Sequence, residues 1–249
     1  QLAGKVPEYQ ERAVELDDQF HSVLYRTKMA KLRLCADELG AAEQEVAEAR
    51  REWDHEGYHV HHFRILGAAV ENALYVGEAE RAWELVAEDW FSLLKSAMML
   101  TEQARIDAWS LYGRAAVGKA SQTSGWESWV ARIKAGRAAR KLRGCDQRWA
   151  GGYADVIEGR VAALYGEFDD AAELLASAQE AFADAEMACH EACVRLRRGQ
   201  LLGGEEGREC VESARETMTE LGVAAPETMA RVVCGGATEA AGRLETEKR

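Results

Sequence analysis

Apolar residues recur along this chain at intervals of three and four, the spacing that places them on one face of an α-helix. The pattern is clearest in three stretches: Tyr58, Leu66, Ala69, Val70, Ala73 and Val76; Ala171, Leu174, Leu175, Ala178 and Phe182; and Cys210, Val211, Ala214, Met218 and Leu221. Residues between these positions are mostly Ala, Glu, Arg and Leu, which favour helix. No stretch shows the period-two alternation of a strand flanked by turn signals. The pattern therefore predicts an all-α fold.

Glycines break these helices at a nearly regular interval. Gly40, Gly77, Gly125, Gly166 and Gly203 are separated by about 40 residues, which is long enough for two helices and a turn. We expect glycine at the end of a helix because it adopts the left-handed conformation without a steric penalty. A period of this length is typical of helical-hairpin repeats, in which each hairpin buries its apolar face only against its neighbours.

A short motif repeats with the glycines. LYVGE at residues 74–78 and LYGE at residues 164–167 are each followed by an alanine, a small residue where two helices approach closely. This spacing resembles a degenerate tetratricopeptide repeat. We therefore predict a right-handed, tetratricopeptide-like α-solenoid of about six antiparallel helical hairpins, forming one domain over residues 1–234, with a flexible C-terminal tail over 235–249. The expected helices span residues 6–19, 21–37, 40–56, 58–76, 79–95, 98–120, 125–143, 146–165, 168–186, 188–201, 204–221 and 226–234.

Composition and charge narrow the function classes. The 249 residues carry 31 Lys and Arg against 43 Asp and Glu, a net charge of −12. This acidity disfavours nucleic acid and anionic membranes as partners, because both select basic surfaces. No run approaches the roughly 18 apolar residues of a membrane span, and the first residues contain no apolar signal segment. The six cysteines form no CxxC pair, which is typical of reduced thiols. We expect a cytoplasmic protein without membrane insertion.

Two segments resemble a known family. The first is WDHEGYHVHHF at residues 53–63, which leads through LYVGE at 74–78 to Trp90, and the second is RRGQLLGGEEGR at 197–208. Together they resemble the tetratricopeptide-type C-terminal regions of large bacterial serine/threonine protein kinases, over about residues 10–234. The resemblance implies an α-helical sensor or scaffold region without catalytic residues of its own. The chain itself contains no kinase motif.

Four histidines form the most conspicuous cluster of ionisable residues. They are His55, His59, His61 and His62, and the pair His59 and His62 has the three-residue spacing that places two imidazoles on one helix face. Gly57 interrupts the helix between His55 and His59, and no carboxylate lies at a familiar metal-ligand spacing. Packing between hairpins is therefore favoured, and we expect no metal and no cofactor. A small-molecule or metal-binding sensor or enzyme that uses this cluster remains the alternative.

Three further features have both a structural and a functional interpretation. Cys189 and Cys193 lie one helical turn apart, so they bind metal or oxidise in one interpretation and are simply buried in the favoured one. The basic run over residues 132–148 is either a dock for an acidic partner or, as favoured, a solvated helix face. Trp126 and Trp129 follow a turn and are candidate exposed binding anchors.

The absence of catalytic motifs directs the functional prediction toward binding. The sequence has no glycine-rich phosphate loop, GxSxG or HExxH motif, so we do not expect an enzyme. We predict a non-catalytic protein–protein interaction, scaffold or sensor module whose concave groove binds a protein or peptide. The groove would be lined by the first helix of each pair, with self-association as a purely structural alternative. The candidate partner-binding residues are His62, Arg105, Trp109, Tyr112, Arg160 and Arg197.

Overall fold

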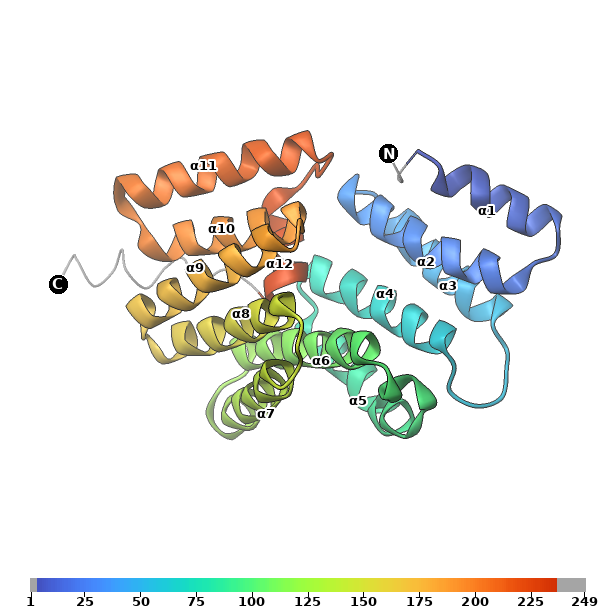
Figure 1. Ribbon diagram of the computed structural model, residues 1–249, viewed down its shortest axis with the longest axis horizontal. Helices are drawn as coiled ribbons and strands as arrows, with labels where there is room; N and C mark the ends of the chain where they lie inside the picture. Colours follow the sequence, from blue (N-terminus) through green and yellow to red (C-terminus); the bar gives the residue numbers. More distant parts are fainter. Residues whose placement is uncertain (1–3, 237–249) are drawn as a thin grey trace.

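A computed structural model describes residues 4–236 (Figure 1). Over this range the chain forms twelve α-helices and one 3₁₀ turn, and none of these residues lies in a strand. The all-α prediction is confirmed. The helices are α1 (Val6–Glu15), α2 (Gln19–Cys35), α3 (Leu39–Glu52), α4 (Val60–Val76), α5 (Ala79–Lys95), α6 (Glu102–Gln122), α7 (Gly125–Arg143), α8 (Arg148–Tyr165), α9 (Phe168–Asp184), α10 (Ala188–Leu202), α11 (Gly204–Glu220) and α12 (Pro226–Cys234), with the 3₁₀ turn η1 (Ala97–Leu100) before α6.

Consecutive helices pack in pairs to form a helical-repeat solenoid. The pairs are α2 with α3, α4 with α5, α6 with α7, α8 with α9 and α10 with α11. The first helices also pack on one another, α2 against α4, α4 against α6 and α6 against α8, which stacks the pairs. At α10 and α11 the backbones meet: a Cβ on Gly199 would lie only 2.7 Å from the carbonyl oxygen of Gly207. Small residues are thus required where paired helices touch.

Helix boundaries follow the predicted glycine signals at four of the five positions: Gly203 ends α10 and Gly125 begins α7, both with positive φ. Gly77 and Gly166 close α4 and α8 in the left-handed conformation, with φ of 84° and 82°. Gly40 behaves differently, because it lies inside α3 and the turn before that helix falls at Asp37, with φ of 62°. Thr101 caps α6, where its side chain accepts a hydrogen bond from the backbone N–H of Ala104, the third residue of the helix.

The last helix folds back into the middle of the solenoid. α12 packs on α10 and also on α4, and Figure 1 shows it in the centre of the molecule between these two helices. The backbone N–H of Ala224, just before α12, donates to the carbonyl of Cys35 at the end of α2, at 2.8 Å. The guanidinium of Arg231 in α12 donates to the carbonyl of Tyr75 in α4, at 3.2 Å. The C-terminal segment therefore joins the first half of the solenoid to the last.

Buried arginines hold the C-terminal end of α12. Arg114 of α6 donates to the carbonyl of Val232 at 2.8 Å, and Arg197 of α10 donates to the carbonyl of Gly236 at 3.0 Å. The last carbonyls of a helix have no partner within the helix and carry partial negative charge, so cations stabilise them. Gly235 and Gly236, the first residues of the expected tail, are buried here, whereas residues 237–249 lie outside the described range.

Candidate functional site: a charged pocket between the first helices

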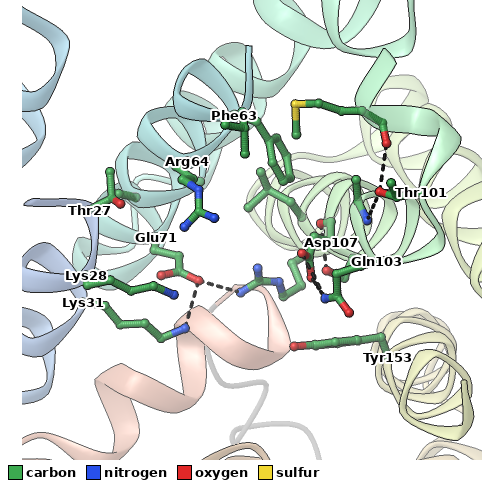
Figure 2. Close-up of a pocket in the computed structure, with 18 of the residues that line it drawn as sticks. Thr27, Lys28, Lys31, Phe63, Arg64, Glu71, Thr101, Gln103, Asp107 and Tyr153 are labelled. Atoms are coloured by element: carbon green, nitrogen blue, oxygen red, sulfur yellow. Dashed lines mark hydrogen bonds and ion pairs between the residues drawn. The ribbon is translucent and has the colours of Figure 1, made fainter. Parts of the chain in front are cut away.

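A pocket of about 590 Å³ opens between the first helices of the repeats (Figure 2). It receives side chains from α2, α4, α6, α8 and α10, so five consecutive pairs contribute to it. Its walls combine apolar side chains with a concentration of charge. The apolar residues include Val60, Phe63, Ala68 and Leu111, and the polar ones include Lys28, Lys31, Arg64, Glu71, Asp107, Arg114, Tyr153 and His190.

Glu71 is the internal counter-ion of the pocket. Its carboxylate lies 3.5 Å from the ammonium of Lys31 and 3.7 Å from the guanidinium of Arg114. Burial opposes ionisation of Glu71, but the two cations outweigh that effect and lower its pKa. Glu71 in turn raises the pKa of Lys31. These three groups therefore satisfy one another and stay charged.

Two further cations of the pocket have no such partner. Neither Lys28 nor Arg64 forms an ion pair with any residue in the described range, and the Nε of Arg64 is buried without a hydrogen-bond acceptor there. Burial, followed by repulsion from Arg64 and Lys31, lowers the pKa of Lys28. The nearby Asp107 accepts from Gln103 at 3.1 Å, and burial raises its pKa. Figure 2 shows the lysines and Arg64 directed into the same space, which is thus a site for negative charge.

Tyr153 and His190 lie on the side of the pocket formed by α8 and α10. The Tyr153 hydroxyl and the Nε2 of His190 are 2.9 Å apart and share a hydrogen bond. Burial lowers the pKa of His190 to about 3 and raises the pKa of Tyr153. Both groups are therefore neutral at neutral pH, and neither has the pKa of an efficient proton-transfer catalyst. They offer hydrogen bonds to a bound group.

None of the six residues predicted to contact a partner lines this pocket, and two of them are core aromatics. Trp109 is buried against Trp90, with ring centroids 4.8 Å apart, and Tyr112 is buried against Trp83, at 5.1 Å. Both rings fill the space between α5 and α6, and contact of either ring with a partner stays a prediction.

The predicted arginines are likewise occupied within the fold. Arg160 and Arg197 are each only 1% exposed, and Arg197 binds the end of α12. Arg105 donates to the carbonyls of Met99 and Leu100, at 3.3 and 3.2 Å, and holds η1 against α6. Arg105 and Arg197 thus stabilise the fold through these contacts, and partner contact by the arginines stays a prediction.

The pocket residues have a sequence signal that was overlooked. Arg64 and Glu71 lie at positions i and i+7 of α4, and Asp107 and Arg114 repeat the same spacing in α6. A charged stripe on the inner face of an otherwise apolar helix marks a buried polar site, because solvated charges belong on the outer face.

His61 and His62 of the histidine cluster contribute to the fold, whereas His55 and His59 are exposed. His61 is fully buried between Phe20 and Trp53, with ring centroids at 4.3 and 4.4 Å, and burial lowers its pKa to about 4. His62 caps α4: its Nδ1 accepts from the backbone N–H of His59 at 3.1 Å. No group of three or more His, Cys, Asp or Glu side chains in residues 4–236 is arranged to hold a metal. His62 also borders a smaller hollow of about 300 Å³.

The cysteines are free thiols in the described part of the chain. Cys193 is buried and Cys189 is partly buried, one turn apart on α10 as the spacing predicted. A hydrogen bond from Cys193 lowers the pKa of Cys189 to about 7, against the opposing effect of burial. In the same range, no helix has the length and apolarity needed to cross a lipid bilayer.

Two histidines, the buried His61 and the half-buried His190, make the fold sensitive to acid. The pKa values of His61 and His190, about 4 and about 3, lie below the ordinary 6.5. Below pH 6.5 the unfolded chain therefore binds protons that the folded chain does not, so stability is complete above pH 6.5 and falls as pH is lowered. We expect the free energy of unfolding to fall by up to about 1.4 kcal/mol per pH unit for each histidine as the pH is lowered. Urea unfolding between about pH 7.5 and 5 measures this change.

The variant His61→Phe isolates one of these contributions. Phenylalanine fits an aromatic niche and does not titrate, so the pH dependence of its unfolding free energy should be shallower than that of the wild type. The exposed His55, replaced by glutamine, is the control and should leave the slope unchanged. If the unfolding free energies of His61→Phe and the wild type depend equally on pH, His61 is not a source of the acid sensitivity.

Comparison with known proteins gives no assignment by similarity. The chain matches no protein-family model, no curated protein and no solved structure at a significant level. The geometry of the pocket is therefore the basis for inferring function.

Proposed function

We propose that this chain is a non-catalytic binding module whose central pocket receives an acidic segment of a protein partner. The observation that carries the proposal is the pair of cations Lys28 and Arg64, neither of which forms an ion pair in the described range. Arg64 is half-buried, whereas Lys28 is exposed. Leaving the half-buried charge of Arg64 unpaired is costly, and a carboxylate or phosphate supplied by a partner offsets that cost. The rest of the chain is acidic and repels an acidic partner, which restricts binding to this pocket.

The construction of the pocket supports recognition of a polypeptide. Five helices fix its walls, so little conformational entropy is lost when a segment binds. Glu71 holds Lys31 and Arg114 in place, which leaves the other two cations for the ligand. Phe63 and Leu111 add apolar surface beside the charges. A volume of about 590 Å³ accommodates a few side chains.

Two considerations favour a binding role in signalling over catalysis. Tyr153 and His190 are both neutral near pH 7 and are suited to hydrogen bonding. The resemblance of residues 53–63 and 197–208 to regions that accompany bacterial serine/threonine kinases supports a setting in kinase-linked signalling. The alternative, a sensor or enzyme built on the histidine cluster, is less favoured because His61 is enclosed by aromatic rings.

A variant that fills the pocket tests the proposal. Gly67 lines the pocket, and a Cβ added there meets nothing within 4 Å, so Gly67→Leu starts a side chain beside the cavity without a clash at its Cβ. Leucine also favours helix over glycine by several tenths of a kcal/mol, roughly, so the fold should be kept. We expect Gly67→Leu to lose the partner that the wild type captures from native cells.

Gly151→Leu is the matched control for this experiment. Gly151 also lies within a helix and also has open space around its Cβ, but it does not line the pocket. Mass spectrometry of the captured proteins should show the same partner for wild type and Gly151→Leu. Retention of that partner by Gly67→Leu would refute the pocket as the recognition site.

A further inference from the structure

The outer face of α7 carries an uncovered aromatic stripe. The helix packs on α6 and α8 through Ala131, Ala135, Ala138, Ala139 and Leu142, which are buried. Its other side exposes Trp126, Trp129 and Ile133, at 72%, 43% and 48%. The two indole rings lie 4.6 Å apart. Large side chains exposed together on one helix face are typical of an interaction surface.

The same face becomes basic one turn further along. Arg137 and Arg140 follow the stripe at the next helical positions, and both are exposed. Neither forms an ion pair with any residue of the described range, whereas Arg143 binds Asp155 and Glu158 on α8. Arg137 lies 6.0 Å from the ring of Trp109, the far limit of a cation–π contact. The face is thus aromatic in its first half and cationic in its second.

These positions are arranged symmetrically about Ile133. Trp129 precedes it by four residues and Arg137 follows it by four; Trp126 precedes it by seven and Arg140 follows it by seven. An antiparallel copy of α7 reverses this order. Each tryptophan of one helix then faces an arginine of the other, and the two Ile133 side chains meet on the axis.

We propose that α7 pairs with α7 of a second copy of this chain in an antiparallel two-fold contact. Trp126 stacks on the partner's Arg140 and Trp129 on the partner's Arg137. Because the contact is two-fold, each tryptophan–arginine pair forms twice. Guanidinium groups stack favourably on indole faces, and Trp and Arg dominate the energy of protein interfaces. A parallel pairing would instead place arginine against arginine, so the charges select the antiparallel arrangement.

The position of α7 allows this contact. Figure 1 shows α7 at the edge of the molecule, away from α12. Gly136, on the same face, has open space around its Cβ and lies opposite Val130 of the other copy, where two helices can approach closely. No residue of α7 lines the central pocket, so pairing leaves the pocket accessible and does not depend on its proposed function.

Sedimentation velocity over a concentration series tests the self-association. The wild type should shift from monomer to dimer with rising concentration, and Trp126→Ala and Arg140→Glu should each weaken the dimer by at least about tenfold. Arg208→Glu changes the charge equally at an exposed site on α11 and should leave the dimer intact. Circular dichroism checks that the variants remain folded.

Disulfide cross-linking then tests the register. With the four partly exposed native cysteines replaced by serine, Ile133→Cys should cross-link to itself. Trp126→Cys and Arg140→Cys should cross-link when mixed, and each should do so far less alone. A monomer at every concentration overturns the proposal, as does equal cross-linking of Trp126→Cys alone and in the mixture. A chain that stays monomeric until an acidic amphipathic helix is added overturns it as well.

Discussion

Replacing Arg114 with leucine is expected to lower the free energy of unfolding by about 3–5 kcal/mol. The guanidinium is 7% exposed, donates to the carbonyl of Val232 at 2.8 Å and lies 3.7 Å from Glu71. Without it, a carbonyl at the end of α12 has lost its donor and the Glu71 carboxylate keeps only Lys31. Both losses leave buried polar groups less satisfied, which is the costly way to break a buried pair. Urea unfolding measures the change.

Two comparisons separate this effect from a general loss of charge. Arg148→Leu removes an arginine that is 66% exposed and paired with Asp184, so its cost should stay within about 1 kcal/mol. Adding Glu71→Gln to Arg114→Leu removes the stranded carboxylate and should restore part of the stability. A cost below about 1 kcal/mol for Arg114→Leu would show that α12 is not held in this way.

The double variant Lys28→Glu, Arg64→Glu is expected to weaken binding of the captured acidic partner by about 100-fold or more. Each substitution replaces an unpaired cation of the pocket with a carboxylate, so attraction becomes repulsion at the two sites that receive the ligand. Isothermal titration calorimetry gives the dissociation constant. Wild-type affinity should also fall as salt is added, because salt screens the interaction.

The control for charge reversal gives the chain the same net charge as the Lys28→Glu, Arg64→Glu variant. Arg12→Glu with Arg208→Glu changes the total by the same amount at two exposed residues on α1 and α11, far from the pocket lining. Its affinity should remain within about a factor of three of the wild type. If both double variants lose affinity equally, the effect is one of overall charge and the pocket is not the site.

The helices could be predicted from the sequence because their signals are local. Apolar spacing placed each helix, and glycines such as Gly77 and Gly166 mark ends where the backbone takes the left-handed conformation. Gly40 shows the limit of that signal, since glycine is also tolerated inside a helix when nothing crowds it.

The site was harder to predict because it depends on contacts between distant parts of the chain. Periodicity alone does not reveal that α12 returns to the centre, so Arg160 and Arg197 were assigned to an open groove although α12 and its neighbours cover them. Trp109 and Tyr112 show a related limit, because a sequence does not tell whether an aromatic residue belongs to a core or to a binding surface, and both rings are buried. The charged stripe of α4, in contrast, was a readable local signal.

The separate roles of the arginines explain how one fold supplies both rigidity and a binding site. Arg197 is enclosed and holds the C-terminal segment, whereas Arg64 is half-buried and directed into the pocket. Arg114 lies between these roles, because it contacts both α12 and the pocket carboxylate of Glu71. The closure of the solenoid by α12 and the shape of the pocket therefore depend on a shared residue.

NMR of the arginine Nε–H groups during titration with the captured acidic segment tests the central claim most directly. The resonance of Arg64 should shift and saturate as the segment binds, because its Nε has no acceptor in the described part of the chain. The resonance of the exposed Arg208 should stay in place. A bound segment that leaves the Arg64 resonance unchanged would contradict recognition in the central pocket.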